Sequence, residues 1–461
     1  MLANSKIFKA YDVRGEWGKD WDADFVYRIG LAVASSLTPK IVAIGRDMRA
    51  SSDIIFSQLC SALTASGVHV IDLGLCGTEL TYFASSFLEN VDATIMITAS
   101  HNLGKDNGLK ITKKGSLALG LDSGLSAIRD LALSDTDFVS ADVKGVVSTV
   151  DVWEKYKEHV FSLAQADLRS LSGKKIVVDA GNGMGGYQFD KVLAPFLEKL
   201  PLEVVPMYWE PDGSFPNHLA DPFQEKNVEA LKKRVVAEGA LLGIALDGDG
   251  DRVFFVDDRG RYISGYYFAA LMTRYMLKRF NTVGEKTVHD PRYFWATCEA
   301  IKEFDGVPVK SDVGHTLIKA AMRENNSLFS AECSGHVFYR SNNFAESTML
   351  TILYVLQFIV DEGLLSSAVD YYFENYPISG EINFIVEDKD AVLRKLEEMY
   401  SSGIVIWDDG LSVSLSDWRF NIRPSNTQPL LRLNVEAKDK GLIASKVAEL
   451  KEAIGGTVAD H

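Results

Sequence analysis

Short apolar runs rich in β-branched residues alternate with helical patterns along most of the chain, and each run ends in small polar residues. The clearest run, 93–97, leads into Thr-Ala-Ser-His-Asn, and similar runs lie at 41–44, 174–179 and 241–246. Strands that alternate with helices indicate parallel sheets with crossover helices. Because ligands bind at the carboxyl ends of strands in such sheets, the polar residues after these runs are the candidate functional residues.

The pattern changes from about residue 366. Short strands predicted at 382–386, 404–407 and 411–415 adjoin through tight turns, and a helix is predicted at 392–400. This pattern is typical of an antiparallel sheet with helices on one face. The sequence therefore predicts three similar α/β units followed by a separate α+β domain.

Composition excludes several classes of protein. The 461 residues are 47% hydrophobic and 24% charged, as in an ordinary soluble globular protein. A formal charge of −15 without a basic run argues against nucleic acid or an anionic membrane as a partner. The four cysteines lack zinc-ligand spacing, the N-terminus lacks an apolar signal core, and the most apolar helix, at 349–360, is too short to span a bilayer. We expect a cytoplasmic protein.

Three aspartates that alternate with glycine follow the last of the four apolar runs: Asp247, Asp249 and Asp251. Glycine lets the backbone curl so that the carboxylates converge, and ligands made only of oxygen favour Mg²⁺. An EF-hand is excluded, because Arg252 stands where its loop needs glycine and Asp258 where it needs glutamate. A solvated acidic loop is the remaining alternative.

Ser100, which follows the run at 93–97, is ambiguous alone, because serine after a strand is more often a turn or cap residue than a nucleophile. Three carboxylates near residue 250 would repel one another unless a cation held them. We therefore expect the Ser100 hydroxyl to face these aspartates across one pocket. Ser100 lacks the G-x-S-x-G elbow of a serine hydrolase, and the glycines at 181–186 are out of register for a dinucleotide site.

Three further places offer contacts to anions or sugars. Arg14 beside a turn glycine and Lys110 on a returning strand are either anion contacts or solvated residues. Glu332 in Glu-Cys-Ser-Gly-His suits the hydroxyls of a sugar or merely caps a helix. Arg423 begins Arg-Pro-Ser-Asn-Thr, a set of donors that suits phosphate or forms a capped turn.

Together these stretches strongly resemble the α-D-phosphohexomutase family, and within it the bacterial phosphomannomutase/phosphoglucomutase branch. The resemblance covers the whole chain. It rests on Tyr-Asp-Val-Arg-Gly at 11–15, the phosphoserine loop at 98–102, the metal loop at 247–252, the sugar loop at 332–336 and the phosphate loop at 423–427.

The resemblance implies an α/β fold class, with three topologically similar α/β domains and a C-terminal α+β domain around a central cleft. The expected domains are 1–150 with the phosphoserine loop, 151–253 with the metal loop, 254–365 with the sugar loop and 366–461 with the phosphate loop. The last domain is expected to rotate and close the cleft.

The resemblance also implies a reaction, the transfer of phosphate between O1 and O6 of mannose or glucose, with Mg²⁺ as cofactor and hexose 1,6-bisphosphate as intermediate and activator. The implied catalytic residues are Ser100, His101, Lys110, Arg14 and His315. The implied metal ligands are Ser100, Asp247, Asp249 and Asp251. The implied substrate-binding residues are Tyr11, Arg252, Arg292, Glu332, Ser334, His336, Arg423, Ser425, Asn426 and Thr427.

Departures from the family pattern affect the expected substrate. Leu103 replaces the usual proline, Ala331 replaces a common glycine, Arg292 stands where the branch often has lysine, and 344–347 lacks the usual aspartates. A phosphoglucosamine mutase and a non-catalytic sugar-phosphate binding protein are the alternatives. We expect small sugar phosphates as partners, no nucleic acid or membrane, and a monomer or small homo-oligomer.

Overall fold

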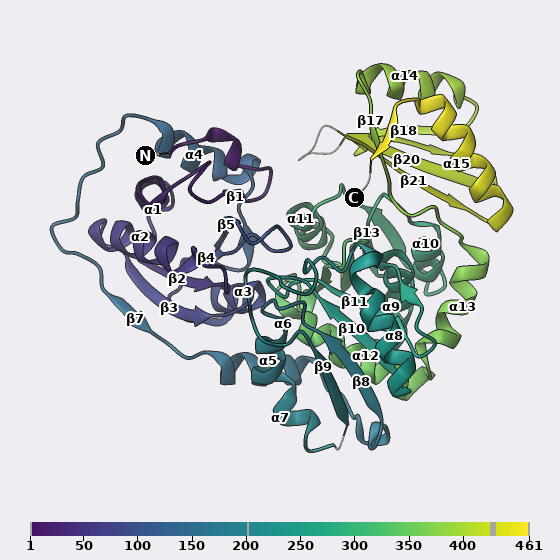
Figure 1. Cartoon of the computed structure of the whole chain (residues 1–461), viewed down its shortest axis with the longest axis horizontal. Coiled ribbons are helices and arrows are strands. Elements are labelled where there is room, and N and C mark those ends of the chain that lie inside the picture. Colours follow the sequence, from purple (N-terminus) through teal and green to yellow (C-terminus); the bar gives the residue numbers. More distant parts are fainter. Residues whose placement is uncertain (1, 201, 425–429, 460–461) are drawn as a thin grey trace. The chain divides into compact units, whose positions relative to one another are not determined.

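The structure is a computed structural model that describes residues 2–200, 202–424 and 430–459. Its residues group into two compact units. The first unit holds the chain up to Tyr262 together with His336–Asp361, and the second holds Ile263–Gly335 together with the chain from Glu362 on. Figure 1 labels the helices and strands.

A seven-stranded sheet in the first unit has the order β1-β5-β4-β2-β3-β7, with β6 beside β5. Neighbours among β4, β2, β3 and β7 are parallel, whereas β5 is antiparallel to β1 and β4. The strands are β1 (Val13–Glu16), β2 (Ile41–Arg46), β3 (His69–Leu75), β4 (Ala93–Ile97), β5 (Asp106–Lys113), β6 (Leu117–Ala118) and β7 (Val147–Thr149). The helices are α1 (Ala23–Leu37), α2 (Ser52–Ala65), α3 (Thr78–Phe87) and α4 (Leu125–Leu133).

Local sequence explains where these elements begin and what they bury. Helix α1 begins after Asp22, whose side chain accepts a hydrogen bond from the Phe25 amide. Phe25, Ile29 and Val33 recur at helical spacing and are fully buried. Strand β4 is buried along its whole length, as its apolar run predicts, and it delivers the serine loop at its carboxyl end.

A second sheet in the order β12-β11-β10-β8-β9 presents the aspartate loop. Strands β8, β9 and β10 are parallel, and β11 returns antiparallel to β10, so the aspartates lie at the connection between β10 and β11. The strands are β8 (Lys175–Asp179), β9 (Glu203–Met207), β10 (Leu242–Leu246), β11 (Val253–Asp257) and β12 (Tyr262–Ile263). The helices are α5 (Trp153–Ala164), α6 (Gly185–Val192), α7 (Ala194–Leu197) and α8 (Glu229–Glu238).

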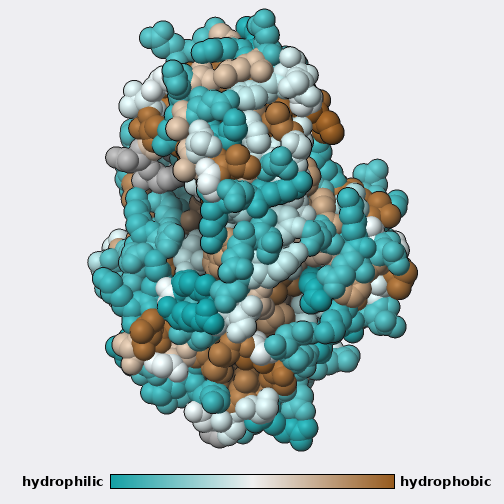
Figure 2. Space-filling model, turned by 90° about the vertical axis from the view of Figure 1, so that its right-hand side faces the viewer, coloured by the Kyte–Doolittle hydropathy of each residue, from teal (hydrophilic) through white to brown (hydrophobic). Residues whose placement is uncertain are grey.

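The predicted apolar helix is present as α12 (Thr348–Glu362), which follows β16 (Val337–Tyr339). Every α12 residue from 348 to 359 is buried. Within the described residues, no single helix combines the length and hydrophobicity that a membrane crossing needs; only α12 taken together with α13 (Leu365–Asn375) meets that test, by length and composition alone. Figure 2 shows one face, on which hydrophobic residues form separate groups among hydrophilic ones.

The second unit contains the parallel strands β13 (Lys286–His289) and β14 (Val307–Lys310), strand β15 (Phe329–Ala331), and helices α9 (Gly265–Arg279), α10 (Trp295–Lys302) and α11 (His315–Asn325). Its other sheet is antiparallel throughout, in the order β18-β19-β20-β21-β17-β22. These strands are β17 (Ile382–Ile385), β18 (Ile404–Asp408), β19 (Gly410–Ser414), β20 (Trp418–Pro424), β21 (Leu431–Ala437) and β22 (Thr457–Ala459). Helices α14 (Lys389–Met399) and α15 (Lys440–Ile454) pack on it, which confirms the expected α+β end of the chain.

Two stretches whose residues read as one strand and one helix form shorter elements in the structure. The strand-like stretch 7–15 forms a strand only from Val13 on, because Ser5–Ile7 forms a 3₁₀ turn and the Lys9 amide donates to the Asp12 carbonyl. The helix in the stretch 151–171 ends at Ala164, where Gln165 adopts a left-handed conformation that stops the helix.

Candidate active site

The serine loop after β4 has an unusual backbone that other residues hold in place. Ser100 has φ = 49°, a region that non-glycine residues seldom occupy, and it is only 3% exposed. Its amide donates to Thr98 Oγ1 at 2.8 Å. The Arg49 guanidinium donates at 2.6–2.9 Å to the carbonyl oxygens of Leu103, Asp106, Ser100 and Asn102. The loop conformation therefore depends on Arg49.

The aspartate loop meets the serine loop directly. A Cβ atom on Gly248 would lie 2.3 Å from the carbonyl oxygen of Ser100, so only glycine permits this approach. Ser100 Oγ donates a hydrogen bond to Asp247 Oδ2 at 2.8 Å. The prediction that the Ser100 hydroxyl faces the aspartates is confirmed.

Lys110, on β5, joins the other two carboxylates. Its Nζ donates to Asp249 Oδ2 and Asp251 Oδ2, each at 2.6 Å, and the Thr78 hydroxyl also donates to Asp249 Oδ2 at 2.5 Å. Burial and the negative charge of Asp249 raise the pKa of Asp251. Burial also acts against ionisation of Asp249, but the Lys110 ammonium outweighs it and lowers the Asp249 pKa. Lys110 is therefore a fixed cation of the cluster.

Arg252 places a second cation beside the serine oxygen. It donates from Nε to Asp247 Oδ2 at 2.9 Å and from Nη2 to Ser100 Oγ at 3.0 Å. The same Nη2 contacts Nδ1 of His101, which lies 3.2 Å from Ser100 Oγ. Burial, with the charge of Arg252, keeps the His101 pKa well below its usual value.

The three aspartates fit a divalent metal ion. One ligand oxygen from each lies within 4.8 Å of the others. Asp249 Oδ1 and Asp251 Oδ1 are buried and accept no hydrogen bond from any described residue. Three carboxylates also exceed the two cations, Lys110 and Arg252, that contact them. A hard cation bound by oxygen would use the free oxygens and balance the charge, so the donor set suits Mg²⁺.

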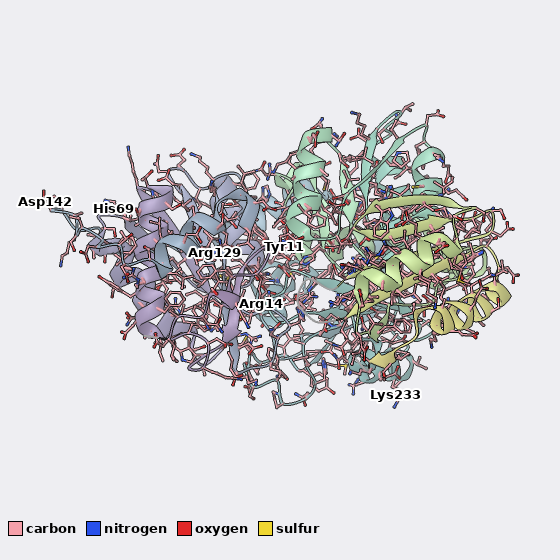
Figure 3. The ribbon with its side chains drawn as sticks, turned by 90° about the horizontal axis from the view of Figure 1, so that it is seen from above. Tyr11, Arg14, His69, Arg129, Asp142 and Lys233 are labelled. Atoms are coloured by element: carbon pink, nitrogen blue, oxygen red, sulfur yellow. The ribbon has the colours of Figure 1, made fainter. Side chains whose placement is uncertain are left out.

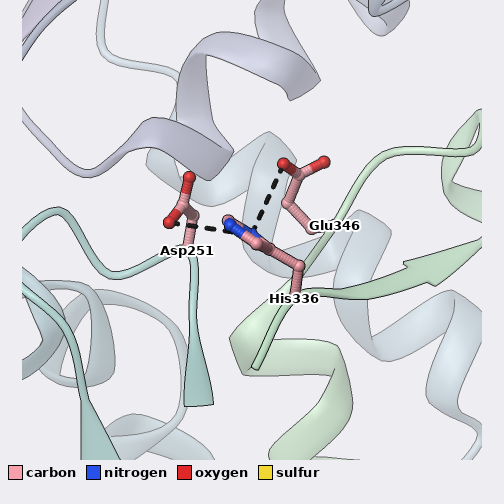
Figure 4. Close-up of side chains that lie close together, drawn as sticks. All are labelled: Asp251, His336 and Glu346. Carbon is pink, nitrogen blue, oxygen red and sulfur yellow. Dashed lines mark ion pairs between the residues drawn. The ribbon is translucent and has the colours of Figure 1, made fainter. Parts of the chain in front are cut away.

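His336 lies next to the same cluster. Its Nδ1 is 3.9 Å from Asp251 Oδ1 and 3.8 Å from Glu346 Oε1, as Figure 4 shows. His336 immediately precedes β16, and Glu346 lies two residues before α12. The family resemblance implied that His336 contacts the substrate, whereas Glu346 was not among the predicted site residues, because only the fold brings it to the histidine.

Arg14, on β1, reaches the serine loop from the other side of β5. It donates from Nη1 to Asn102 Oδ1 at 3.0 Å and from Nη2 to Asp12 Oδ2 at 2.6 Å. Figure 3 labels Tyr11 and Arg14 near the middle of the view, whereas Asp142, also in the first unit, lies at its left edge. The side chain predicted to contact the anion is therefore held at the loop that carries the serine.

In the second unit, two of the residues predicted to bind the sugar, Arg292 and Glu332, are in contact. Its Nε lies 3.0 Å from both carboxylate oxygens of Asp290, and its Nη2 donates to Glu332 Oε1 at 3.2 Å. Burial raises the Glu332 pKa, although Arg292 acts in the opposite direction. Ser334 follows in the same loop, and His315 is the first residue of α11.

The predicted phosphate loop is described only in part. Arg423, near the end of β20, is buried, with Nη2 3.6 Å from Glu381 Oε2 and Nε 3.8 Å from Asp409 Oδ2. The other three residues predicted for this loop, Ser425, Asn426 and Thr427, lie outside the described residues.

Sequence reasoning missed Glu79, at the start of α3. This buried carboxylate accepts hydrogen bonds from the Tyr156 hydroxyl, from Ser347 Oγ at 2.9 Å, and from the amide and hydroxyl of Thr348. Thr348 Oγ1 in turn donates to the Gly250 carbonyl of the aspartate loop at 2.9 Å. Burial raises the Glu79 pKa to about 7. Glu79 was missed because its hydrogen-bond partners lie far away in sequence. Arg49 was also missed, but it follows β2 in Gly-Arg-Asp-Met-Arg, and this place at the end of a strand could have identified it.

Four family models together match most of the chain, between residues 5 and 453. Those for the phosphoglucomutase/phosphomannomutase alpha/beta/alpha domains I, II and III match residues 5–136, 154–260 and 264–376, and the model for the C-terminal domain matches 381–453. The chain belongs to this family. The resemblance inferred from the motifs and the expected fold class are therefore confirmed.

Similar proteins agree with this assignment. The chain is 39% identical over 453 residues to a protein named phosphohexose mutases from Xanthomonas campestris, covering 97% of this chain and 99% of that one. It is 36% identical over 462 residues to a phosphomannomutase from Vibrio cholerae, with 97% and 98% coverage. A solved phosphoglucomutase/phosphomannomutase family protein from Burkholderia thailandensis aligns with a TM-score of 0.86 at 28% identity, covering 99% of this chain and 100% of that one. The chain is thus an enzyme of the phosphohexose mutase class.

Proposed function

We propose that the enzyme interconverts hexose 1-phosphate and hexose 6-phosphate, with mannose or glucose as the hexose, through a phosphoserine at Ser100. The proposal rests on the buried Ser100 Oγ, which lies 2.8 Å from Asp247 Oδ2 and 3.0 Å from Arg252 Nη2. The relatives named phosphohexose mutases and phosphomannomutase support this class of substrate.

In the proposed reaction, phosphorylated Ser100 gives its phosphoryl group to the free hydroxyl of a bound hexose phosphate. The bond between phosphorus and Ser100 Oγ breaks as the bond to the sugar oxygen forms, and the hydroxyl proton passes to a nearby base. The product is a hexose 1,6-bisphosphate. After the sugar turns round, its other phosphoryl group returns to Ser100, and the phosphoenzyme is restored.

Cations held by this chain would stabilise the charge on the phosphoryl group in transit. Arg252 donates to the serine oxygen itself, Lys110 lies among the aspartates, and Arg14 is bound to the serine loop. The three aspartates would hold Mg²⁺, which supplies further positive charge when bound. Because two carboxylates raise the pKa of Lys110, this residue acts as a cation, and a histidine (His101, His315 or His336) is the proposed base.

The remaining candidates would bind the substrate. Arg292, Glu332, Ser334 and Tyr11 are proposed to contact the sugar, and Arg423, Ser425, Asn426 and Thr427 its non-reacting phosphate. Closure of the last domain is proposed to keep water from the phosphoserine. The domain limits at 150, 253 and 365, the cytoplasmic location and a monomer or small homo-oligomer stay predictions.

Phosphate on Ser100 is the direct test. The protein is incubated with hexose 1,6-bisphosphate, and peptide mass spectrometry locates the added phosphate. We expect it on Ser100, and phosphate elsewhere, or none, would contradict the covalent mechanism.

A second experiment chooses the sugar. We propose that kcat/KM is higher for mannose 1-phosphate or glucose 1-phosphate than for glucosamine 1-phosphate. The reverse order would make the enzyme a phosphoglucosamine mutase.

With the preferred sugar, Arg423→Ala is expected to raise KM about 10- to 100-fold with a smaller change in kcat, because a charge-assisted contact to phosphate is lost.

A further inference from the structure

Two charged residues in the second unit lie outside the residues considered so far. Arg419 on β20 and Glu436 on β21 face each other in register across the strand pair, and we call them the clamp. Arg419 Nη1 lies 3.5 Å from Glu436 Oε2, and both side chains are 0% exposed. Burying two charges is costly unless each is also well hydrogen-bonded, so their other partners indicate what they do.

Arg419 binds the carbonyl groups of a turn that leads into α10. Its guanidinium donates to the carbonyl oxygens of Pro291 and Arg292 at 3.2 and 2.8 Å. The same guanidinium lies over the ring of Phe294, 4.1 Å from the ring centroid, in cation–π geometry. Arg419 thus contacts three residues of the turn: Pro291, Arg292 and Phe294.

Glu436 binds the amide groups of the same turn. Its carboxylate accepts from the Phe294 amide at 3.2 Å and from the Trp295 amide at 3.0 Å. It also accepts from the Tyr266 hydroxyl, whose oxygen accepts from the Ala296 amide at 3.0 Å. The carbonyl groups of the turn are therefore held by a cation and its amide groups by an anion.

The held turn carries Arg292, the residue that donates to Glu332. Strand β20 also carries Arg423, four residues after Arg419. Residues four apart on a strand lie on the same face. A single strand therefore bears the clamp that holds the sugar-binding turn and the arginine proposed to bind phosphate.

We propose that Arg419 and Glu436 are positioning residues that place Arg292 for sugar binding and tie this turn to the strand of Arg423. The inference rests on the proposed function, because it assumes that Arg292 contacts a hexose phosphate. In such a substrate the sugar and its non-reacting phosphate lie a set distance apart. A link that keeps the two binding groups near each other would favour substrates of that length.

A double-mutant cycle on kcat/KM tests this role, with mannose 1-phosphate and glucose 1-phosphate as substrates. Glu436→Gln keeps the side-chain shape and removes the charge that pairs with Arg419. We expect about a 10-fold loss, mainly through KM, in the otherwise unaltered chain, and less than a 2-fold loss when Arg292→Ala is already present. Equal losses in both backgrounds would mean a general structural effect and overturn the proposal, as would no loss in either.

Amide hydrogen exchange of the peptide 291–299 provides a readout that needs no turnover. Glu436→Gln is expected to speed exchange there at least 10-fold, because two amides lose a charged acceptor. The matched control is Tyr400→Phe, which removes a hydroxyl that donates to Glu449 at 2.6 Å in the same domain and should leave the peptide unchanged. Unchanged exchange in Glu436→Gln would overturn the clamp.

If Glu436→Gln does not fold, Arg419→Lys takes its place in the double-mutant cycle, because lysine keeps the charge and loses the fork that binds two carbonyl groups. Its expected and contradicting results are the same. Failure of the unaltered chain to convert either sugar phosphate would refute the proposed function, whereas the exchange experiment would still decide whether the clamp holds the turn.

Discussion

Two buried charge clusters, one in each unit, are arranged in opposite ways. In the first unit, the three aspartates at 247–251 outnumber the two cations that contact them, and two of their oxygens accept no hydrogen bond within the described part of the chain. In the second unit, Arg419 and Glu436 are matched one to one, and each also binds the backbone of a turn. The first arrangement is short of positive charge, and the second is balanced.

Under the proposed function, this difference separates a site for chemistry from one that holds a shape. Surplus negative charge around a buried hydroxyl would be unfavourable until a metal ion bound, and the combined cations would then stabilise a phosphoryl group. A balanced pair needs no further ion and would orient a peptide segment instead.

The largest effect is expected from Ser100→Ala. Loss of the proposed phosphoryl carrier should lower kcat by more than about 10³-fold, because no other group replaces a covalent nucleophile. Arg292→Ala in the second unit should act mainly on KM. Steady-state kinetics with mannose 1-phosphate measure both, and circular dichroism checks the fold. A wild-type rate for Ser100→Ala would remove the contrast in roles.

Lys110→Met tests how much the first cluster depends on its cation. Asp249 and Asp251 would lose their shared buried partner, so we expect the free energy of unfolding to fall by about 3–5 kcal/mol, measured by urea denaturation. Lys175→Met is the matched control. Lys175 also bridges two carboxylates, those of Glu203 and Glu238, but at the surface, and its loss should cost far less. Similar losses in the two variants would contradict the interpretation.

Glu79 gives a pH-dependent prediction. Burial raises its pKa from 4.5 to about 7 in the folded chain, so its stabilising contribution is complete below pH 4.5 and is lost as pH rises to about 7. Relative to Glu79→Gln, the unaltered protein should lose about 3 kcal/mol of stability across that range. Urea denaturation of both proteins from pH 5 to 8 measures the difference. A constant difference would show that the folded carboxyl group has an ordinary pKa.

The smallest expected effect concerns the metal ion. Mg²⁺ at about 100 times its dissociation constant should stabilise the unaltered protein by about 2–3 kcal/mol in thermal unfolding. Asp251→Asn should lose most of this gain and, without Mg²⁺, should be at least as stable as the unaltered protein, because one of three repelling charges is gone. Glu436→Gln should keep the Mg²⁺ gain. If Asp251→Asn kept it too, the aspartates would not be the metal site.

The local pattern of apolar and polar residues was enough to predict the strands that precede the two site loops and the buried apolar helix. The apolar run before Ser100 is strand β4, the run before Asp247 is β10, and the apolar helix near residue 350 is α12. The short motifs were enough to predict the family. These predictions succeeded because burial imposes a period on the sequence and because glycine at 248 is required by a close backbone approach.

Other features depend on contacts between distant parts of the chain and have no local signature. The bonds from Arg49 to four carbonyl groups, the position of Glu346 beside His336, and the four bonds to Glu79 are of this kind.

Local sequence is therefore sufficient to predict most strands, the loops at their ends and the kinds of side chain in those loops. Which charges meet depends on the packing of the folded chain, and so does the difference between the cluster that is short of positive charge and the pair that is balanced. The physical reason is that apolar periodicity reports how each segment faces the core, whereas ion pairs such as Lys110 with Asp249 or Arg419 with Glu436 form only after separate strands have packed together.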